Sequence, residues 1–372
     1  MIPVNEPLFC GNESVYLKEC IDSGWVSSEG PFVNKFENQY AEFIGVDYGV
    51  AVSSGTAALE CALYAIGVGK GDEVIIPSFT IISCAIACIR VGAKPVLVDS
   101  NSDNWNIDVD QIETKINKKT KAIMAVHIYG HSVYMDKLIE LKEKYGLLII
   151  EDIAESQGSE YFSKKEDKWW RCGSIGDVAA VSFYANKTVT TGEGGMVLSG
   201  SSDYTERAKS YRNLCFDTKQ RFLHNDIGNN YRMTNLQAAL GLAQLEQVDN
   251  FLKIKQEIGK AYKKELANIN WLRFMHSKEW SKSAYWMYCI LINKEESFNA
   301  QDLSKYLAEH KIGHRPFFKG LHQQDCLREH VDTVKCPNAD EAFEFGLYLP
   351  SGMTMDESKV KIVCNILREY KS

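Results

Sequence analysis

Short apolar runs alternate with amphipathic segments through the first half of the chain. The runs are rich in β-branched residues and predict strands at Gly49–Ser53, Glu73–Ile76, Pro95–Val98, Ala122–His127 and Leu147–Glu151. Between them, apolar residues recur at three- and four-residue spacing, which predicts helices at Gly55–Ile66, Thr80–Val91, Val109–Ile116 and Met135–Tyr145. Strands separated by helix-length crossovers pair in parallel, so this order predicts an α/β fold with a mainly parallel central sheet between helices.

The second half of the chain predicts the end of the large domain and then a second, smaller domain. Strands are expected at Asp177–Phe183 and Gly195–Ser199, and a long helix from about Thr234 to Leu266 is expected to bridge to the second domain. Beyond this helix the pattern predicts a strand and two helices, at Tyr285–Ile292, Ala300–His310 and Ser358–Tyr370. We therefore expect a large domain over residues 1–247 and a smaller α+β domain over residues 248–372.

One segment between the predicted strands is unusually charged. Tyr161–Gly173 combines lysines and acidic residues with the adjacent tryptophans Trp169 and Trp170, and it predicts a protruding hairpin. A solvated loop is the simplest interpretation, and a lid or a dimer contact is the alternative.

Composition narrows the class of protein. The 372 residues are 45% hydrophobic and 24% charged, with a net charge of -7, which fits a globular protein but not one that coats nucleic acid or an anionic membrane. No apolar stretch is long enough to span a bilayer, and no basic segment precedes an apolar one at the N-terminus, so neither a membrane span nor a signal peptide is expected. The eleven cysteines are scattered without a CxxC pair, which indicates reduced thiols and a cytoplasmic location.

Ligand sites in parallel α/β sheets lie beyond the carboxyl ends of the strands, so the residues that follow each predicted strand are the candidates. The first is Ser53-Ser54-Gly55-Thr56, where small residues open a helix whose free amide groups favour an anion such as phosphate. Alone, the motif is more typical of an ordinary helix N-cap.

The second candidate is Asp152, which follows the apolar run LLII and Glu151. A carboxylate at the end of a buried strand is costly unless it has a partner. One such partner is the protonated pyridine nitrogen of pyridoxal 5'-phosphate (PLP). A helix N-cap or a salt bridge is the simpler alternative for a lone aspartate.

The third candidate is Lys187, which follows a strand and precedes the Gly-rich run TVTTGEGG. A lysine in this place is suited to a Schiff base, which requires a neutral amine. Ser182, at the end of the same strand, could donate a hydrogen bond to a phosphate. The helix start, the aspartate and the lysine, each at a strand end, favour a PLP enzyme together more strongly than any of them does alone.

Two other motifs resemble known binding sites, one for a dinucleotide and one for a metal ion, but their sequence context argues against both. The glycines of Gly67–Gly71 resemble a dinucleotide fingerprint, but they follow a helix and precede a strand, the reverse of the required order. His127 and His131 have the spacing of metal ligands, but Gly130 argues against a helix and no third ligand is near in sequence, so no metal site is expected.

Together these stretches resemble the PLP-dependent nucleotide-sugar aminotransferases of the DegT/StrS family, which have fold type I. The resemblance covers essentially the whole chain and is carried by SSGTAAL, GDEVIIPSFT, VHIYGH, EDIAES, SFYANKTVTTGEGGMV, NYRMTNLQAA and Arg315-Pro316. Within the family, the lysine segment is most similar to the perosamine synthases, which aminate GDP-4-keto-6-deoxymannose at C4.

The resemblance implies a role for each matched residue that faces the cofactor. Lys187 would form the Schiff base, and Asp152 would pair with the pyridine nitrogen. The phosphate would be held by four residues, the last of them reaching over from the second subunit of a homodimer with shared active sites: Gly55, Thr56, Ser182 and Asn230.

Two positions depart from the common pattern of the family. Glu155 stands where many members carry Gln or His beside the ring hydroxyl of the cofactor. The ring face is often covered by an aromatic residue directly after PSFT, where this chain has Ile81. Either Ile81 packs there or another side chain supplies the contact.

The resemblance also implies the substrates. L-glutamate would convert PLP to pyridoxamine 5'-phosphate, whose amine would condense with the keto group of a nucleotide-linked 4-keto-6-deoxysugar used for cell-surface glycan such as lipopolysaccharide O-antigen. Lysine rather than histidine at position 187 favours transamination over the related PLP-dependent sugar dehydratases. GDP, UDP and dTDP sugars, the dehydratase reaction and a PLP-binding protein without turnover all remain open.

Gly24–Ser28, near the N-terminus, also matches the family. Candidates for contacts to the sugar and the diphosphate come from this stretch and from the segment of Arg315-Pro316: Trp25, Ser27, Ser28, His314 and Arg315. Arginine binds phosphate with two parallel hydrogen bonds. A structural ion pair is the alternative for Arg315.

Overall fold

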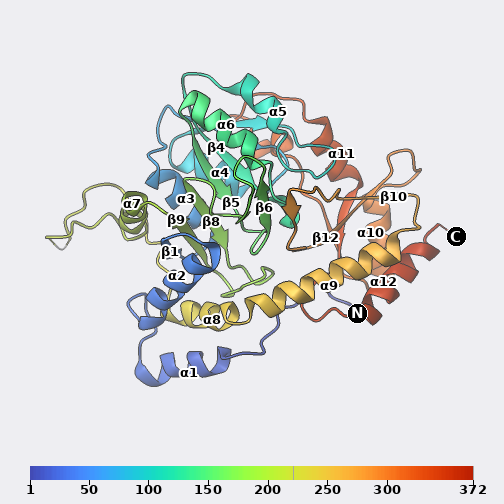
Figure 1. The fold of residues 1–372 in the computed structure, drawn as a ribbon, viewed down its shortest axis with the longest axis horizontal. Coiled ribbons are helices and arrows are strands. Elements are labelled where there is room, and N and C mark those ends of the chain that lie inside the picture. Colours follow the sequence, from blue (N-terminus) through green and yellow to red (C-terminus); the bar gives the residue numbers. More distant parts are fainter. Residues whose placement is uncertain (221, 372) are drawn as a thin grey trace.

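The computed structural model describes residues 1–220 and 222–371 and is built around a seven-stranded sheet (Figure 1). The strands lie in the order β1 (Tyr48–Val52), β9 (Gly195–Ser199), β8 (Val178–Ser182), β5 (Leu148–Asp152), β4 (Thr120–Val126), β2 (Glu73–Pro77) and β3 (Lys94–Val98). β9 runs antiparallel to both of its neighbours, and the other pairs are parallel. The α/β fold with a mainly parallel sheet is thereby confirmed.

Helices cover both faces of this sheet because its strands are apolar on both sides. Val50 and Val52 of β1 pack into one core, whereas Ala51 between them packs into another. The first core is closed by α3 (Gly55–Ala65), α4 (Ser83–Arg90) and α7 (Ser202–Arg212). The opposite face is covered by α2 (Pro31–Ile44), α8 (Asn235–Leu245), α5 (Val109–Ile112) and α6 (Met135–Tyr145), and α1 (Glu13–Ser23) packs on α8.

The C-terminal part forms a second layer around a four-stranded antiparallel sheet, at the right of Figure 1. Its strands are β10 (Leu272–Phe274), β12 (Tyr288–Ile292), β14 (Gly346–Leu349) and β13 (Arg315–Pro316). The helices around it are α9 (Val248–Leu266), α10 (Ala300–Glu309), α11 (Pro337–Phe345) and α12 (Glu357–Glu369). Short 3-10 helices occupy Glu113–Lys115, Ile128–Gly130, Leu321–Gln323 and Asp325–Leu327.

The single long helix predicted from Thr234 to Leu266 is wrong. The structure has two helices, α8 and α9, and Gln247 between them has non-helical angles (φ -103°, ψ 3°). The side chain of Gln244, near the end of α8, donates to Leu8 O at 2.9 Å, which holds this end against the N-terminal segment. α9 then leaves in a new direction toward the smaller sheet (Figure 1). The break coincides with the predicted domain boundary at residue 247, which stays a prediction.

The charged segment forms a hairpin as predicted, but the hairpin does not protrude freely. Its strands β6 (Glu160–Ser163) and β7 (Lys168–Arg171) pair with each other, and β6 also pairs with β11 (Ser281–Lys282). The ammonium of Lys282 lies 3.8 Å from the centre of the Trp169 ring. Pattern analysis missed this contact because β11 is distant in sequence. Within the described residues, no helix has the length and apolar character needed to cross a membrane.

Candidate active site

A cavity of about 340 Å3 lies beyond the carboxyl ends of β5 and β8. It is lined by residues from the large sheet and by Trp286, Phe318 and Tyr348 of the C-terminal part. Seven residues predicted from the sequence share this one lining: Gly55, Thr56, Ile81, Asp152, Glu155, Ser182 and Lys187. The fold thus brings residues that are far apart in the sequence into the lining of one cavity.

The start of α3 forms one end of the cavity. Ser54 is the N-cap, and its hydroxyl accepts a hydrogen bond from Ala57 N at 3.1 Å. A Cβ atom on Gly55 would lie 2.6 Å from Cβ of Ser182, so glycine is what allows the helix start to approach Ser182. The first amides of α3 have no partner inside the helix, and together with the Ser182 hydroxyl they favour an anion.

Asp152 lies at the end of β5 and is 3% exposed. Its Oδ1 accepts from Ala154 N at 3.0 Å, and its Oδ2 accepts from the thiol of Cys84 at 3.4 Å. Burial raises the pKa of Asp152, because its charged form is deprived of water. A cationic hydrogen-bond donor that entered the cavity would relieve this cost.

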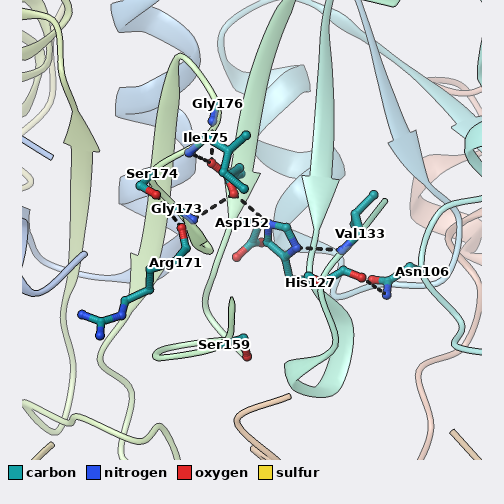
Figure 2. A network of polar contacts seen from close by, with 12 residues as sticks. Asn106, His127, Val133, Asp152, Ser159, Arg171, Gly173, Ser174, Ile175 and Gly176 are labelled. Carbon is teal, nitrogen blue, oxygen red and sulfur yellow. Dashed lines mark hydrogen bonds and ion pairs between the residues drawn. The ribbon is translucent and has the colours of Figure 1, made fainter. Parts of the chain in front are cut away.

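The preceding residue, Glu151, points to the other side of β5 and fixes the end of the strand. Its carboxylate accepts from Gly173 N, Ile175 N and Gly176 N at 2.6 to 2.8 Å and from Nε2 of His127 at 3.0 Å. These four partners are labelled in Figure 2. Burial alone would raise the pKa of Glu151, but the hydrogen bond from His127 and those from the amides hold it below its usual value. This network therefore sets the place from which Asp152 enters the cavity.

His127, the first histidine of the VHIYGH motif, has a structural role in this network. Val133 N donates to its Nδ1 at 2.9 Å, so Nδ1 is the acceptor and Nε2 carries the hydrogen given to Glu151 (Figure 2). His127 N also donates to the carbonyl of Asp152. Among the residues that the structure describes, no cluster of His, Cys, Asp and Glu is placed to hold a metal ion.

Lys187 and Glu155 lie close together in the lining of the cavity. Nζ of Lys187 lies 3.9 Å from Oε1 of Glu155, and their side chains are 10% and 8% exposed. Oε2 of Glu155 accepts from Tyr129 N at 2.9 Å. Burial lowers the pKa of Lys187 and raises the pKa of Glu155 to about 7. The amine is therefore poised closer to its neutral form than an exposed lysine.

Comparison with known proteins identifies the family. Residues 10–368 match the DegT/DnrJ/EryC1/StrS aminotransferase family. The chain belongs to this family. Two relatives named GDP-perosamine synthase match 100% of this chain and 99% of their own length, at 41% identity in Escherichia coli O157:H7 and 38% in Vibrio cholerae.

Two further similar proteins extend the comparison. The putative pyridoxal phosphate-dependent aminotransferase EpsN of Bacillus subtilis is 34% identical over 98% of this chain and 95% of its own length. Among solved structures, the aminotransferase TlmJ of Streptoalloteichus hindustanus aligns with a TM-score of 0.90 and 27% identity, covering 99% of this chain and 98% of that one. The likeness to TlmJ agrees with the fold described above.

Several residues expected from the DegT/StrS pattern do not line the cavity of their own chain. Trp25 and Ser27 are exposed, and their carbonyls accept hydrogen bonds from Asn235 at 2.7 and 2.9 Å. Ser28 lines a separate hollow of about 210 Å3 that also holds Lys209, Arg212 and Arg232. Asn230 is exposed, and its side chain accepts from Arg232 at 3.0 Å.

His314 and Arg315 lie at the edge of the smaller sheet. The imidazole of His314 donates to Ile312 O at 3.0 Å, and Arg315 donates to His314 O at 3.0 Å. Arg315 pairs with Tyr348 across β13 and β14, and Tyr348 lines the cavity. Arg315 therefore lies one strand away from the cavity, and neither Arg315 nor His314 is in its lining.

The sequence interpretation missed the aromatic wall formed by Trp286, Phe318 and Tyr348. These residues follow no strand of the large sheet, so the rule about strand ends does not reach them. Tyr184, which is half exposed at the lining and next to the predicted strand end, could have been found by that rule. Ile81 precedes α4, which begins at Ser83 and not at Thr80 as predicted, and its side chain is free to line the cavity.

Proposed function

We propose that this chain transfers an amino group from L-glutamate to C4 of GDP-4-keto-6-deoxymannose, giving GDP-perosamine for cell-surface glycan. The proposal is supported by the full-length match to two GDP-perosamine synthases and by membership of an aminotransferase family. The observation that carries it is the presence of Lys187, Asp152 and the start of α3 in one cavity.

These residues suit PLP, the cofactor named for the relative EpsN. PLP has a carbonyl carbon, a pyridine nitrogen and a phosphate, and the cavity offers an amine, a buried carboxylate and a helix start to match them. Lys187 would hold the carbonyl carbon, Asp152 the nitrogen, and the phosphate would lie at Gly55, Thr56 and Ser182. When bound, PLP supplies an electron sink for the carbon that gains or loses the amino group.

The side chains of this chain would do the proton work. Nζ of Lys187 would carry the proton to and from C4 of the sugar, a task for which burial prepares it by lowering its pKa. Asp152 would keep the cofactor nitrogen protonated, because a buried carboxylate is stabilised by a cationic partner. Glu155 would lie beside the cofactor ring, and its raised pKa allows it to hold a proton near neutral pH.

The aromatic wall supports a deoxysugar acceptor. Trp286, Phe318 and Tyr348 line the same cavity as Asp152, Glu155 and Lys187, which gives the lining both apolar and polar parts. A 6-deoxysugar has the same mixed character, with a methyl group at C6 and hydroxyl groups elsewhere. Apolar walls with few placed polar groups are the usual way in which a site orients a small molecule.

A homodimer with shared active sites is part of the proposal. Asn230 is exposed in its own chain and follows Leu223 and Ile227, which are 46% and 89% exposed. Exposed apolar side chains beside a polar one suit a contact with a second copy. In that arrangement Asn230 would reach the phosphate site of the other subunit, and Trp25, Ser27, Ser28, His314 and Arg315 would surround the nucleotide sugar.

The reaction can be tested directly with purified protein, PLP and L-glutamate. GDP-, UDP- and dTDP-linked 4-keto-6-deoxysugars are supplied separately, and aminosugar formation is followed by mass spectrometry. The proposal predicts an amine on the GDP sugar at a rate well above the other two. An amine formed faster on UDP or dTDP sugar would overturn the nucleotide assignment, and loss of water from the sugar without gain of nitrogen would indicate a dehydratase.

A further inference from the structure

Trp286 reaches the cavity from the loop between β11 and β12 and covers the amine of Lys187. Nζ of Lys187 lies 3.9 Å from the centre of the indole ring, and Trp286 itself is 3% exposed. A cation over an indole face is attracted by the ring quadrupole, and more strongly where water is excluded. We propose that Trp286 is a further active-site residue, whose indole face binds the protonated amine of Lys187 and holds it in position.

The other charged groups around this amine leave room for such a role. Oε1 of Glu155 is 3.9 Å away, which is beyond hydrogen-bond length, and Asp152 acts on Lys187 through its charge. Glu193, Tyr184 and Tyr348 line the same cavity, and the ammonium of Lys255 donates to the backbone carbonyl of Trp286. The indole face is therefore a partner of the ammonium at the same distance as the nearest carboxylate oxygen, that of Glu155.

The orientation of the indole is fixed relative to Lys187. Nε1 of Trp286 donates to the carbonyl of Asn186 at 2.8 Å, and Asn186 directly precedes Lys187 in the chain. Asn5 donates to the same carbonyl at 2.9 Å. The ring of Tyr129 lies parallel to the indole, with an angle of 9° and a centroid distance of 6.1 Å. The ring cannot turn without breaking the hydrogen bond to Asn186.

Helix α9 holds the backbone that carries Trp286. Lys255 is 1% exposed and donates to Trp286 O at 2.9 Å and to Ser351 O, and burial lowers its pKa to about 7. Gln256 donates to Ser283 O in the same loop at 2.5 Å. A Cβ on Gly259 would lie 2.7 Å from the ring of Tyr285, so glycine allows the close approach of α9. Lys255 is thus a positioning residue for Trp286.

The inference rests on the proposed function, in which Lys187 must gain and lose a proton in every cycle. Burial favours the neutral amine, which can accept a proton. The indole face favours the protonated amine, which can donate one, and it keeps this form beside the reacting carbon. Trp286 would therefore bring the two forms of Lys187 closer in free energy.

The test changes the electron density of the ring and leaves its shape nearly unchanged. Mono-, di- and trifluorotryptophan are placed at position 286 of the full chain without cofactor, and the pKa of Lys187 is measured by competitive acetylation and peptide mass spectrometry. Because fluorine weakens the negative ring face, the pKa of Lys187 is expected to fall stepwise, by about one pH unit over the series. The same series at Trp280, whose ring packs on Tyr134 and Tyr161, is the matched control and should leave Lys187 unchanged.

A Lys187 pKa that does not follow fluorination at position 286 would overturn the proposal. The measurement uses neither PLP nor a sugar, so its failure is distinct from a failure of the proposed amino transfer. For Lys255, the series is repeated in Lys255→Met and in Lys253→Met, an exposed position on the same helix. The dependence on fluorination should be lost only in Lys255→Met. If Lys255→Met does not fold, Gln256→Ala removes the other hydrogen bond from α9 to this loop, and an unchanged dependence on fluorination in Gln256→Ala would contradict positioning of Trp286 by α9.

Discussion

The amine of Lys187 and the carboxyl group of Glu155 lie 3.9 Å apart in a cavity where both side chains are almost completely shielded from water. Burial lowers the pKa of Lys187 and raises that of Glu155, so each group is drawn toward its neutral form. Burial of this pair therefore lowers the free energy of unfolding of the cofactor-free protein, by an amount that depends on pH.

Glu155→Gln should flatten the pH dependence of stability. The pKa of Glu155 is about 7 in the folded chain and 4.5 as a free side chain. Its favourable contribution is complete below pH 4.5 and is lost as the pH rises through 7. Denaturant unfolding of the cofactor-free protein should therefore show wild type losing about 2 to 3 kcal/mol relative to Glu155→Gln between these pH values.

The matched control for this comparison is Glu193→Gln, which removes an exposed carboxyl group at the same cavity. Its stability profile should run parallel to that of wild type. If Glu155→Gln also ran parallel to wild type, the carboxyl group would not have the raised pKa on which the argument depends.

Gly55→Ala should weaken cofactor binding. The new methyl group would lie 2.6 Å from Cβ of Ser182 and would push the start of α3 away from the hydroxyl group. We expect the affinity for PLP to fall at least tenfold and the protein to lose about 1 to 3 kcal/mol of stability. PLP titration followed by absorbance, with thermal unfolding of the cofactor-free chain, measures both effects.

Gly69→Ala is the control for Gly55→Ala, because the nearest atom to its new methyl group, Val91 O, lies 3.8 Å away. This variant should bind PLP as wild type does. Equal affinities for PLP in Gly55→Ala and wild type would contradict the placement of the phosphate at α3.

Glu151→Gln should destabilise the fold and displace Asp152. The amide of glutamine would oppose one or more of the three backbone N–H groups that donate to Glu151 (Figure 2). A buried hydrogen-bond donor that faces other donors and has no acceptor lowers the free energy of unfolding by about 3 kcal/mol or more, which chemical denaturation can measure. Glu160→Gln, which removes only the surface ion pair with Lys282, should change stability by less than about 1 kcal/mol.

Arg315→Ala should raise the KM for the nucleotide sugar about tenfold and leave kcat within a factor of about two. Arg315 is exposed on β13 and pairs with Tyr348, which lines the cavity, so its guanidinium group could bind the diphosphate without touching the reacting atoms. Steady-state kinetics with varied sugar substrate test this. A fall in kcat with unchanged KM would place Arg315 in the chemistry instead of in binding.

The parts of the site that could be predicted from the sequence are those that directly follow a predicted strand. Asp152 and Lys187 follow apolar strands, and the carboxyl ends of parallel strands meet at one edge of a sheet, so their meeting in one cavity could be expected. Trp286 could not be found in this way, because its position depends on contacts of α9 with a distant loop. The break at Gln247 was missed for a similar reason, since the helical pattern continues through it and only tertiary packing ends α8.

The N-terminal candidates do not reach the active site of their own chain. Trp25 and Ser27 match the family motif but are exposed and lie outside the cavity of their own chain. A role for them at the active site depends on the proposed second subunit. Their side-chain chemistry alone does not reveal which subunit they would serve.

The most direct test of the central claim follows nitrogen from donor to acceptor. The protein with PLP is incubated with nitrogen-15 glutamate and GDP-4-keto-6-deoxymannose, and the sugar product is analysed by mass spectrometry. We predict a GDP-linked aminosugar that carries one labelled nitrogen, and no such product from Lys187→Ala. An unlabelled sugar product, or labelled product formed equally well by Lys187→Ala, would contradict amino transfer by this site.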